Sequence, residues 1–285
     1  MKPCAFEYHA PSSIEDALEL LRRFGGEARI LAGGQSLVPA MNFRLARPAV
    51  LIDINGIDRL AGTSEANGSL LIGALTRHVA FERPVARGPV GRILPRLARH
   101  IAHFPIRTRG TFGGSLAHAD PSAEWCTLAL GLDAVVEARS AEGAREIAAA
   151  DFFRSIFTTD LGEAEMLVRV RLPLLDESWR CGFVEFSRRA GDFAIVSAFA
   201  ALKVENGVVR EARLALGGVV DRPVRASDAE KALVGQPPQD GAFRASAAIA
   251  GESFEPMGDI HASEDYKKAI IPVIARRALE QAMAP

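Results

Sequence analysis

Two glycine-rich segments hold the residues whose types and spacing are suited to chemistry. The first contains Ala32, Gly33, Gly34, Gln35 and Ser36, and the second contains Thr111, Phe112, Gly113, Gly114 and Ser115. In a glycine-rich turn the backbone N–H groups converge on an anionic oxygen, and the missing Cβ lets a phosphate come within hydrogen-bond distance. The hydroxyls of Ser36, Thr111 and Ser115 add donors without bulk or charge. Together the segments predict a binding site for a phosphate-bearing ligand.

Neither segment matches the common nucleotide-binding motifs. Neither GxGxxG nor GxxxxGK[ST] is present, so any nucleotide is bound in some other fold. A single Gly-Gly dipeptide by itself more often marks a tight turn than a binding site. Two pairs, each after an apolar stretch and each followed by a small hydroxyl residue, favour binding. Arg107 and Arg109 flank the second segment and are able to neutralise a pyrophosphate, although solvated surface arginines are the more frequent finding.

Composition excludes several classes of protein. The 34 Lys and Arg residues balance 35 Asp and Glu residues to a net charge of -1, so no global charge attracts nucleic acid or an anionic membrane. Cys4, Cys126 and Cys181 lie far apart and cannot hold an iron–sulfur cluster alone. No stretch reaches the ~18 uncharged apolar residues of a membrane span, and the first residues lack a signal-peptide core. We expect a cytoplasmic chain with no metal site, nucleic-acid partner or membrane span.

The first segment is positioned by a predicted small α/β lobe over residues 1–57. A capping box formed by Ser12 and Glu15 begins a helix, and Gly25-Gly26 ends it. Residues 28–32 and 50–54 are apolar and predict strands, with the glycine segment and a turn or short helix between them. The segment therefore follows the end of a strand.

The second segment lies in a predicted second lobe, residues 58–175. This lobe has strands at 69–75, 133–138 and 166–172 and helices at 91–103 and 124–130, and the segment is expected to be a loop before the second helix. The polar stretch 174–180 predicts a domain boundary. Residues 176–285 form the second domain, in which Asn206-Gly207 predicts a hairpin and helices begin at Ser227 and after Ser263.

At these motifs the chain resembles the FAD-binding medium subunit of the molybdenum hydroxylases, the family of carbon monoxide dehydrogenase and xanthine dehydrogenase. The resemblance rests on the runs Ala32-Gly-Gly-Gln-Ser-Leu37 and Arg109-Gly-Thr-Phe-Gly-Gly-Ser-Leu-Ala-His-Ala-Asp-Pro121, and on Arg188-Arg-Ala-Gly-Asp-Phe-Ala194 in the last third. It covers essentially the whole chain. It implies an α+β fold: a two-lobed vanillyl-alcohol-oxidase-like (PCMH-type) FAD-binding domain, then a C-terminal domain with a small antiparallel sheet and helices.

The resemblance also implies which residues hold FAD. The two glycine segments would enclose its pyrophosphate and ribityl chain, mostly through backbone amides. Glu124 matches an acidic cofactor contact a few positions past the Asp-Pro step. Leu161 and Leu167 match apolar positions near the flavin or adenine, and Ile101 matches a contact on a helix. For these three aliphatic residues plain core packing is the alternative.

Two positions depart from the family's pattern. Some members carry a tyrosine beside the flavin where this chain has Phe193, whose ring still stacks on the isoalloxazine but forms no hydrogen bond. Some members have a lysine in the preceding strand, where Glu185 stands here. The reversed charge leaves Glu185 outside the expected site.

The implied function is an FAD-carrying electron-transfer subunit of a molybdenum hydroxylase. In the family a large molybdopterin subunit oxidises the substrate, a small subunit with [2Fe–2S] clusters carries the electrons to FAD, and an external acceptor takes them. We expect a dimer of such heterotrimers, with no general acid or base on this chain. The alternatives are a stand-alone FAD oxidase of the same fold and a non-catalytic nucleotide-binding subunit. The substrate stays open, and so does the choice of acceptor among NAD, oxygen, a quinone and a carrier protein.

Overall fold

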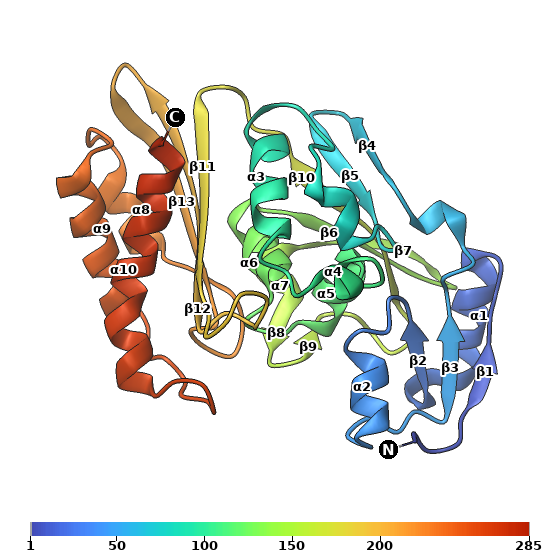
Figure 1. Ribbon diagram of the computed structural model, residues 1–285. Helices are drawn as coiled ribbons and strands as arrows, with labels where there is room; N and C mark the ends of the chain where they lie inside the picture. Colours follow the sequence, from blue (N-terminus) through green and yellow to red (C-terminus); the bar gives the residue numbers. More distant parts are fainter. Residues whose placement is uncertain (1, 285) are drawn as a thin grey trace.

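The computed structural model describes residues 2–284 as three layers arranged side by side (Figure 1). The N-terminal lobe contains a parallel three-stranded sheet with the order β1-β3-β2. Its elements are β1 (Glu7–His9), α1 (Ile14–Phe24), η1 (Gly25–Glu27), β2 (Ala28–Leu31), α2 (Leu37–Asn42), β3 (Val50–Asp53) and η2 (Asp58–Leu60). The first glycine segment therefore joins β2 to α2, as expected.

Helix α1 begins one residue later than the capping box predicts. The Ser13 hydroxyl, not that of Ser12, accepts a hydrogen bond from the Asp16 N–H at 3.0 Å. The buried face of the helix is the expected apolar one: Ile14, Ala17, Leu18 and Leu21. Gly25 ends the helix with φ +51°, a conformation that glycine adopts without steric cost.

The second lobe is built on an antiparallel five-stranded sheet with the order β4-β5-β10-β6-β7. Its strands are β4 (Thr63–Ala66), β5 (Ser69–Gly73), β6 (Val135–Ser140), β7 (Gly143–Ala148) and β10 (Met166–Pro173), and a separate hairpin pairs β8 (Phe153–Ser155) with β9 (Thr158–Thr159). Its helices are η3 (His78–Glu82), α3 (Gly88–Ala98), α4 (Phe104–Arg107), α5 (Phe112–His118), α6 (Glu124–Gly131) and α7 (Ala149–Phe152).

In this lobe one prediction is wrong and the bounds of a predicted helix differ. The second glycine segment is not a loop: it begins helix α5, because the Thr111 hydroxyl caps the Gly114 N–H at 3.0 Å. The helix expected over 91–103 ends at Ala98. The chain then turns through Ala102, whose φ is +41°, so Ile101 is not on a helix.

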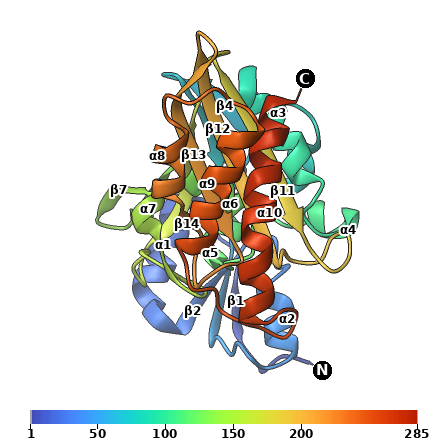
Figure 2. The same cartoon turned by 90° about the vertical axis from the view of Figure 1, so that its left-hand side faces the viewer.

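The C-terminal part is an antiparallel four-stranded sheet with helices on one face (Figure 2). The elements are β11 (Trp179–Phe186), β12 (Val196–Glu205), β13 (Val208–Gly217), β14 (Val224–Arg225), α8 (Ser227–Leu233), α9 (Asp240–Glu252) and α10 (Glu264–Met283). The expected hairpin at Asn206 and Gly207 is present, with φ +53° and +75°. Within residues 2–284 no helix is long and apolar enough to cross a membrane.

Candidate functional site

The two glycine segments meet at Gly33. A Cβ on this residue would lie 2.3 Å from the Arg109 carbonyl oxygen and 2.8 Å from the Gly110 Cα. Only glycine fits such an approach between two backbones. The absent side chain of Gly33 therefore serves contact between the segments, and brings the loop after β2 against the residues that precede α5.

Asn55 and Arg77 hold this junction together. The Asn55 amide donates to the Ala32 carbonyl at 2.7 Å, and the Arg77 guanidinium donates to the Asn55 side-chain oxygen at 2.6 Å. Arg77 also donates to the Arg109 carbonyl. One amide and one guanidinium thus connect the N-terminal lobe, the first segment and the second lobe.

The first segment presents free backbone donors. Across the part of the chain that the structure describes, the N–H groups of Gly33, Gly34, Gln35 and Ser36 have no hydrogen-bond partner. Gly34 has φ +71°. The side-chain amide of Gln35 donates to the Gly33 carbonyl at 2.9 Å, which fixes the turn. Consecutive free N–H groups at the start of a helix are suited to anionic oxygens. This arrangement fits a pyrophosphate.

In the second segment only the Thr111 N–H has no partner within residues 2–284, which corrects the expectation that most of its amides face the ligand. Four consecutive N–H groups are bonded within the protein: Phe112 to the Thr76 carbonyl at 2.9 Å, Gly113 to the Ala74 carbonyl at 3.0 Å, Gly114 to the Thr111 hydroxyl at 3.0 Å and Ser115 to the Thr111 carbonyl at 3.0 Å. The hydroxyls of Thr111 and Ser115 remain as donors. Gly113 is required for packing, because its Cβ would lie 2.7 Å from the Ala74 Cα.

The two arginines beside the second segment differ. Arg107 is committed to the protein: it donates to Glu82 at 2.6 Å, to the Ile101 carbonyl at 3.0 Å and to the Ala102 carbonyl at 2.8 Å. The Arg109 side chain is exposed and makes no hydrogen bond within residues 2–284. Of the two, Arg109 is therefore the one available to an anionic ligand.

Glu124 begins helix α6 and is 4% exposed. Burial raises its pKa to about 7, with a further contribution from the Asp120 carboxylate. The neighbouring Trp125 packs its ring 4.9 Å from that of Phe112. Phe112 itself is fully buried, so its side chain belongs to the core of the second lobe.

The remaining expected residues lie at different depths. Ile101 and Leu167 are 7% and 4% exposed and belong to the hydrophobic core of the second lobe, and Leu161 packs against that core. Phe193 lies in the connection between β11 and β12 and is 55% exposed. The structure thus brings the glycine segments together, but it buries Ile101, Leu167 and the Phe112 ring.

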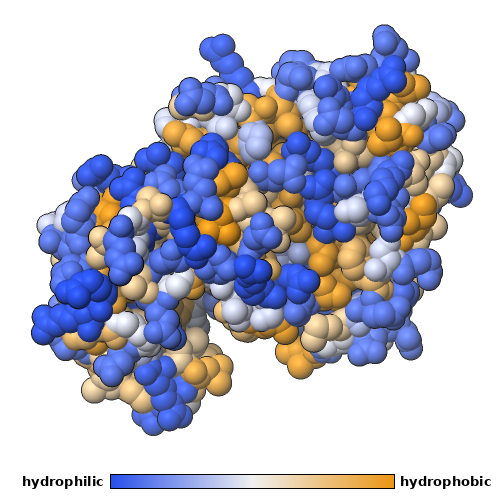
Figure 3. Space-filling view, turned by 180° about the vertical axis from the view of Figure 1, so that it is seen from behind, coloured by the Kyte–Doolittle hydropathy of each residue, from blue (hydrophilic) through white to orange (hydrophobic). Residues whose placement is uncertain are grey.

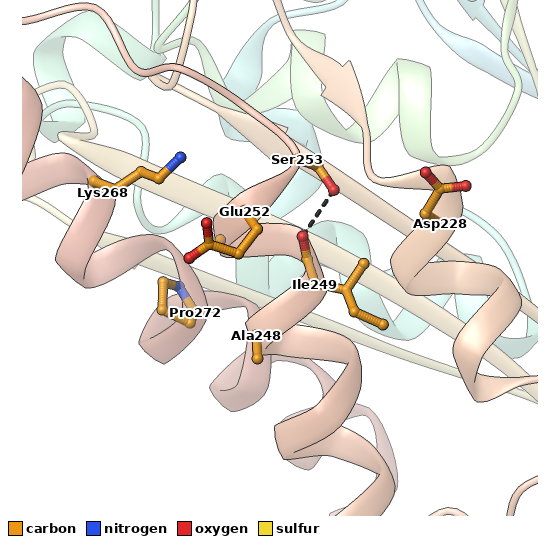
Figure 4. Close-up of a pocket in the computed structure, with 8 residues that line it drawn as sticks. Asp228, Ala248, Ile249, Glu252, Ser253, Lys268 and Pro272 are labelled. Atoms are coloured by element: carbon orange, nitrogen blue, oxygen red, sulfur yellow. Dashed lines mark hydrogen bonds between the residues drawn. The ribbon is translucent and has the colours of Figure 1, made fainter.

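The surface is notched beside the N-terminal lobe (Figure 3), and the C-terminal part contains a hollow. Seen from behind, the outline of the molecule is notched between the N-terminal lobe and the rest, and most of this face is polar (Figure 3). A hollow of about 600 Å³ lies elsewhere, between α8, α9 and α10 (Figure 4). Two of its charged groups have partners, since Asp228 binds Lys231 at 2.8 Å and Lys268 binds the Phe254 carbonyl at 2.8 Å. We assign it no ligand.

Sequence reasoning missed two residues near these sites, Asn55 and Arg77, and left Glu185 outside the site because of its charge. Asn55 had a usable signal, because it lies two residues past the end of strand β3, where polar side chains line the edge of a parallel sheet. Arg77 had none, because its role depends on packing between distant segments. Among residues 2–284, no three His, Cys, Asp or Glu side chains are grouped so as to hold a metal ion.

Comparisons with known proteins identify the class. Residues 4–175 match the family described as the FAD binding domain in molybdopterin dehydrogenase, and residues 182–282 match the CO dehydrogenase flavoprotein C-terminal domain. The chain belongs to this family of FAD-binding medium subunits of molybdenum hydroxylases.

Several relatives are similar over nearly their whole length. The 6-hydroxypseudooxynicotine dehydrogenase complex subunit alpha of Paenarthrobacter nicotinovorans is 38% identical over 99% of this chain and 96% of its own. A chain of carbon monoxide dehydrogenase from Hydrogenophaga pseudoflava superposes with a TM-score of 0.93, 35% identity and coverage of 99% and 98%. A chain of quinoline 2-oxidoreductase from Pseudomonas putida 86 superposes with a TM-score of 0.92 and 38% identity, covering 99% of this chain and 98% of its own. The predicted fold class and the assignment as an FAD-binding oxidoreductase subunit are confirmed.

Proposed function

We propose that this chain carries FAD as the electron-transfer subunit of a molybdenum hydroxylase, between a [2Fe–2S] subunit and an external acceptor. The observation that carries the proposal is the row of free N–H groups from Gly33 to Ser36, set against Arg109. FAD, when bound, supplies the redox chemistry, and the protein supplies binding, orientation and exclusion of competing reactions.

Each residue has a defined task in this proposal. The N–H groups of the first segment and the hydroxyls of Thr111 and Ser115 bind the pyrophosphate, and Arg109 balances its charge. Glu124 accepts hydrogen bonds from cofactor hydroxyls, and Phe193 covers the flavin ring. The rest of the proposed site acts by backbone position or packing: Ala32, Phe112, Gly113, Gly114, Ile101, Leu161 and Leu167.

The remaining cofactors would lie on partner chains. Carbon monoxide dehydrogenase medium chains and the nicotine 6-hydroxylase medium subunit are named as parts of larger assemblies. We propose a large molybdopterin subunit and a small iron–sulfur subunit, in a dimer of heterotrimers. All three cysteines of this chain are unpaired thiols, which suits a cytoplasmic location. Cell fractionation checks the location, and the mass of the intact complex checks the stoichiometry.

The visible spectrum of the chain reconstituted with FAD tests the redox proposal. We expect flavin absorption without iron or molybdenum in the isolated chain, and both metals in a complex purified with two further subunits. A chain that takes up no flavin would overturn the proposal in favour of a scaffold subunit. Turnover of a substrate with oxygen by the flavin-loaded chain alone would instead indicate a stand-alone oxidase.

Gly33→Ala tests the binding site directly. The added Cβ collides with the Arg109 backbone and forces the two segments apart, so we expect the Kd for FAD to rise about tenfold or more. Fluorescence titration with FAD measures this. Gly241→Ala on helix α9 is the matched control, because a Cβ there meets nothing within 4 Å. Equal affinities in the two variants would refute the assignment of the first segment.

A further inference from the structure

Glu185 points from the C-terminal sheet toward the second lobe. Side chains alternate along strand β11. A Cβ on Gly182 would lie 2.2 Å from the Ala278 carbonyl of α10, so that face of the strand meets the helices. Phe183, on the opposite face, lies 5.4 Å from the His100 ring just beyond α3. Glu185 shares the face of Phe183 and is directed into the junction between the second lobe and the C-terminal sheet.

One oxygen of this carboxyl group is buried without a partner. The Glu185 side chain is 2% exposed, and its Oε2 atom makes no hydrogen bond in the described part of the chain. The nearest basic group is His100, whose Nδ1 lies 4.0 Å from that oxygen. Burial lowers the pKa of His100, so the imidazole is neutral at pH 7 and brings no positive charge. A buried polar atom left unsatisfied in this way calls for an explanation.

A second buried acid faces the same junction. The pKa of Glu185 is raised to about 9, first by burial and then by the Glu124 carboxylate, and only the Ser187 hydroxyl opposes the shift. Glu124 comes from α6, and the Asp120 carboxylate, in the chain just before that helix, raises the pKa of Glu124. From β12, Ser197 lies opposite Glu185 in the strand register and shares a polar contact of 3.4 Å with Thr127 of α6. The cations Arg213 and Arg92 oppose the rise that burial causes in the pKa of Cys181, which lies toward the other end of β11 from Glu185.

We propose that Glu124 and Glu185 are a proton-sharing acid pair, in which Glu185 carries the proton at neutral pH, and that the pair belongs to the cofactor site. Two carboxylates buried together without a cation cannot both ionise, so one keeps a proton. The part that concerns FAD rests on the proposed function, in which Glu124 contacts the cofactor. Because FAD carries an anionic pyrophosphate, it binds best while the pair holds its proton, and its affinity falls as the pair ionises.

Infrared spectroscopy of the FAD-free chain tests the pair alone. At pH 8, above the pKa of about 7 of Glu124 and below the pKa of about 9 of Glu185, we expect the carbonyl band of a protonated carboxylic acid, lost in Glu185→Gln and lost in the native chain above about pH 10. Glu177→Gln is the matched control, because Glu177 is an exposed carboxylate paired with Arg92 and its loss leaves the band unchanged. If Glu185→Gln does not fold, Glu124→Gln replaces it: without the Glu124 carboxylate, which raises the pKa of Glu185, the band is lost at a lower pH. A native chain without the band, or a variant that retains it unaltered, overturns the pair.

A titration of FAD against pH tests the link to the cofactor. We expect the Kd of the native chain to rise about tenfold between pH 6 and pH 9.5, and that of Glu185→Gln to change less than about threefold. If the Kd for FAD rises equally in both chains, the link to the cofactor is overturned, whereas the infrared band still supports the acid pair. Absence of FAD binding at every pH overturns the proposed function, and the band then reports on the pair independently.

Discussion

His78 shows how one buried side chain makes stability depend on pH. The residue is 6% exposed, and its Nδ1 accepts a hydrogen bond from the Trp125 indole at 3.0 Å. Gly110 leaves it space, since a Cβ there would lie 2.5 Å from the His78 Nε2. The pKa of His78 is lowered to about 4, first by burial and then by the charges of Arg77 and Arg107. The imidazole is therefore held neutral beside the junction of the glycine segments.

We predict acid destabilisation through this residue. The unfolded chain takes up a proton on His78 near pH 6.5 and the folded chain only near pH 4, so its contribution is complete above pH 6.5 and disappears as the pH falls toward 4. The shift corresponds to about 3 kcal/mol. Urea unfolding should show that the free energy of unfolding falls much less between pH 7 and pH 4.5 in His78→Gln than in the native chain. In His261→Gln, at an exposed site, it should fall as much as in the native chain. An equal fall in both variants would contradict the mechanism.

At the scale of elements, one buried lysine connects helix α10 to the sheet beneath it. Lys267 lies one turn into the helix, and its ammonium donates to the Gly218 carbonyl at 2.8 Å and to the Asp259 carboxylate at 2.7 Å. Its side chain is only 4% exposed. The contact joins the end of β13, the chain before α10 and the helix itself, so removing it leaves polar groups of two segments without a donor.

Lys267→Met should lower the free energy of unfolding by about 2 kcal/mol, because the buried Gly218 carbonyl loses a charged donor, whereas Asp259, which is 40% exposed, is left to water. Lys268→Met is the control on the next residue of the helix. Its partners are the Phe254 carbonyl and the exposed Glu255 carboxylate, so its loss should cost about 1 kcal/mol. Urea unfolding of both variants measures the difference. An equal loss of unfolding free energy in the two variants would show that burial of the Lys267 contacts adds nothing to stability.

The elements that the sequence predicted well carry local signals. Helix α10 begins where Ser263 caps the Tyr266 N–H, and the hairpin forms at Asn206 and Gly207. Strand β7 was missed because nearly all its residues are exposed and no alternation marks it. Helix α9 was missed because no side chain caps it. The helix α5 was missed because glycines are poor helix formers, and Gly113 is kept helical by its packing on Ala74.

The candidate site was predictable only in part, for the same reason. The glycine segments and Glu124 follow from the resemblance to the family, whereas their contact at Gly33 follows from how the lobes pack. The bonded amides of α5 and the unpartnered Glu185 depend on chain neighbours far away in the sequence. Composition and spacing carry no information on such contacts.

At the scale of the whole molecule, one hydrophobic core crosses from the second lobe into the C-terminal sheet. The cluster that contains Trp125 and Leu128 of α6 also contains Phe183 of β11 and Phe199 of β12. Phe199 is fully buried, and a Cβ on Gly131 would lie 2.2 Å from its ring. The division of the chain at residue 175 into two domains stays a prediction, and this shared core argues that the two parts do not unfold independently.

Phe199→Ala should therefore destabilise both parts at once. Removing a fully buried ring leaves a cavity that costs about 3–5 kcal/mol. Because the cavity opens in the shared cluster, calorimetry should show a single transition for residues 58–285, moved to lower temperature as a unit. Phe104→Ala removes a ring that is 58% exposed and should leave the transition in place. Two transitions, of which Phe199→Ala moves only one, would mean that the C-terminal sheet folds by itself and that the flavin site of the second lobe does not depend on it.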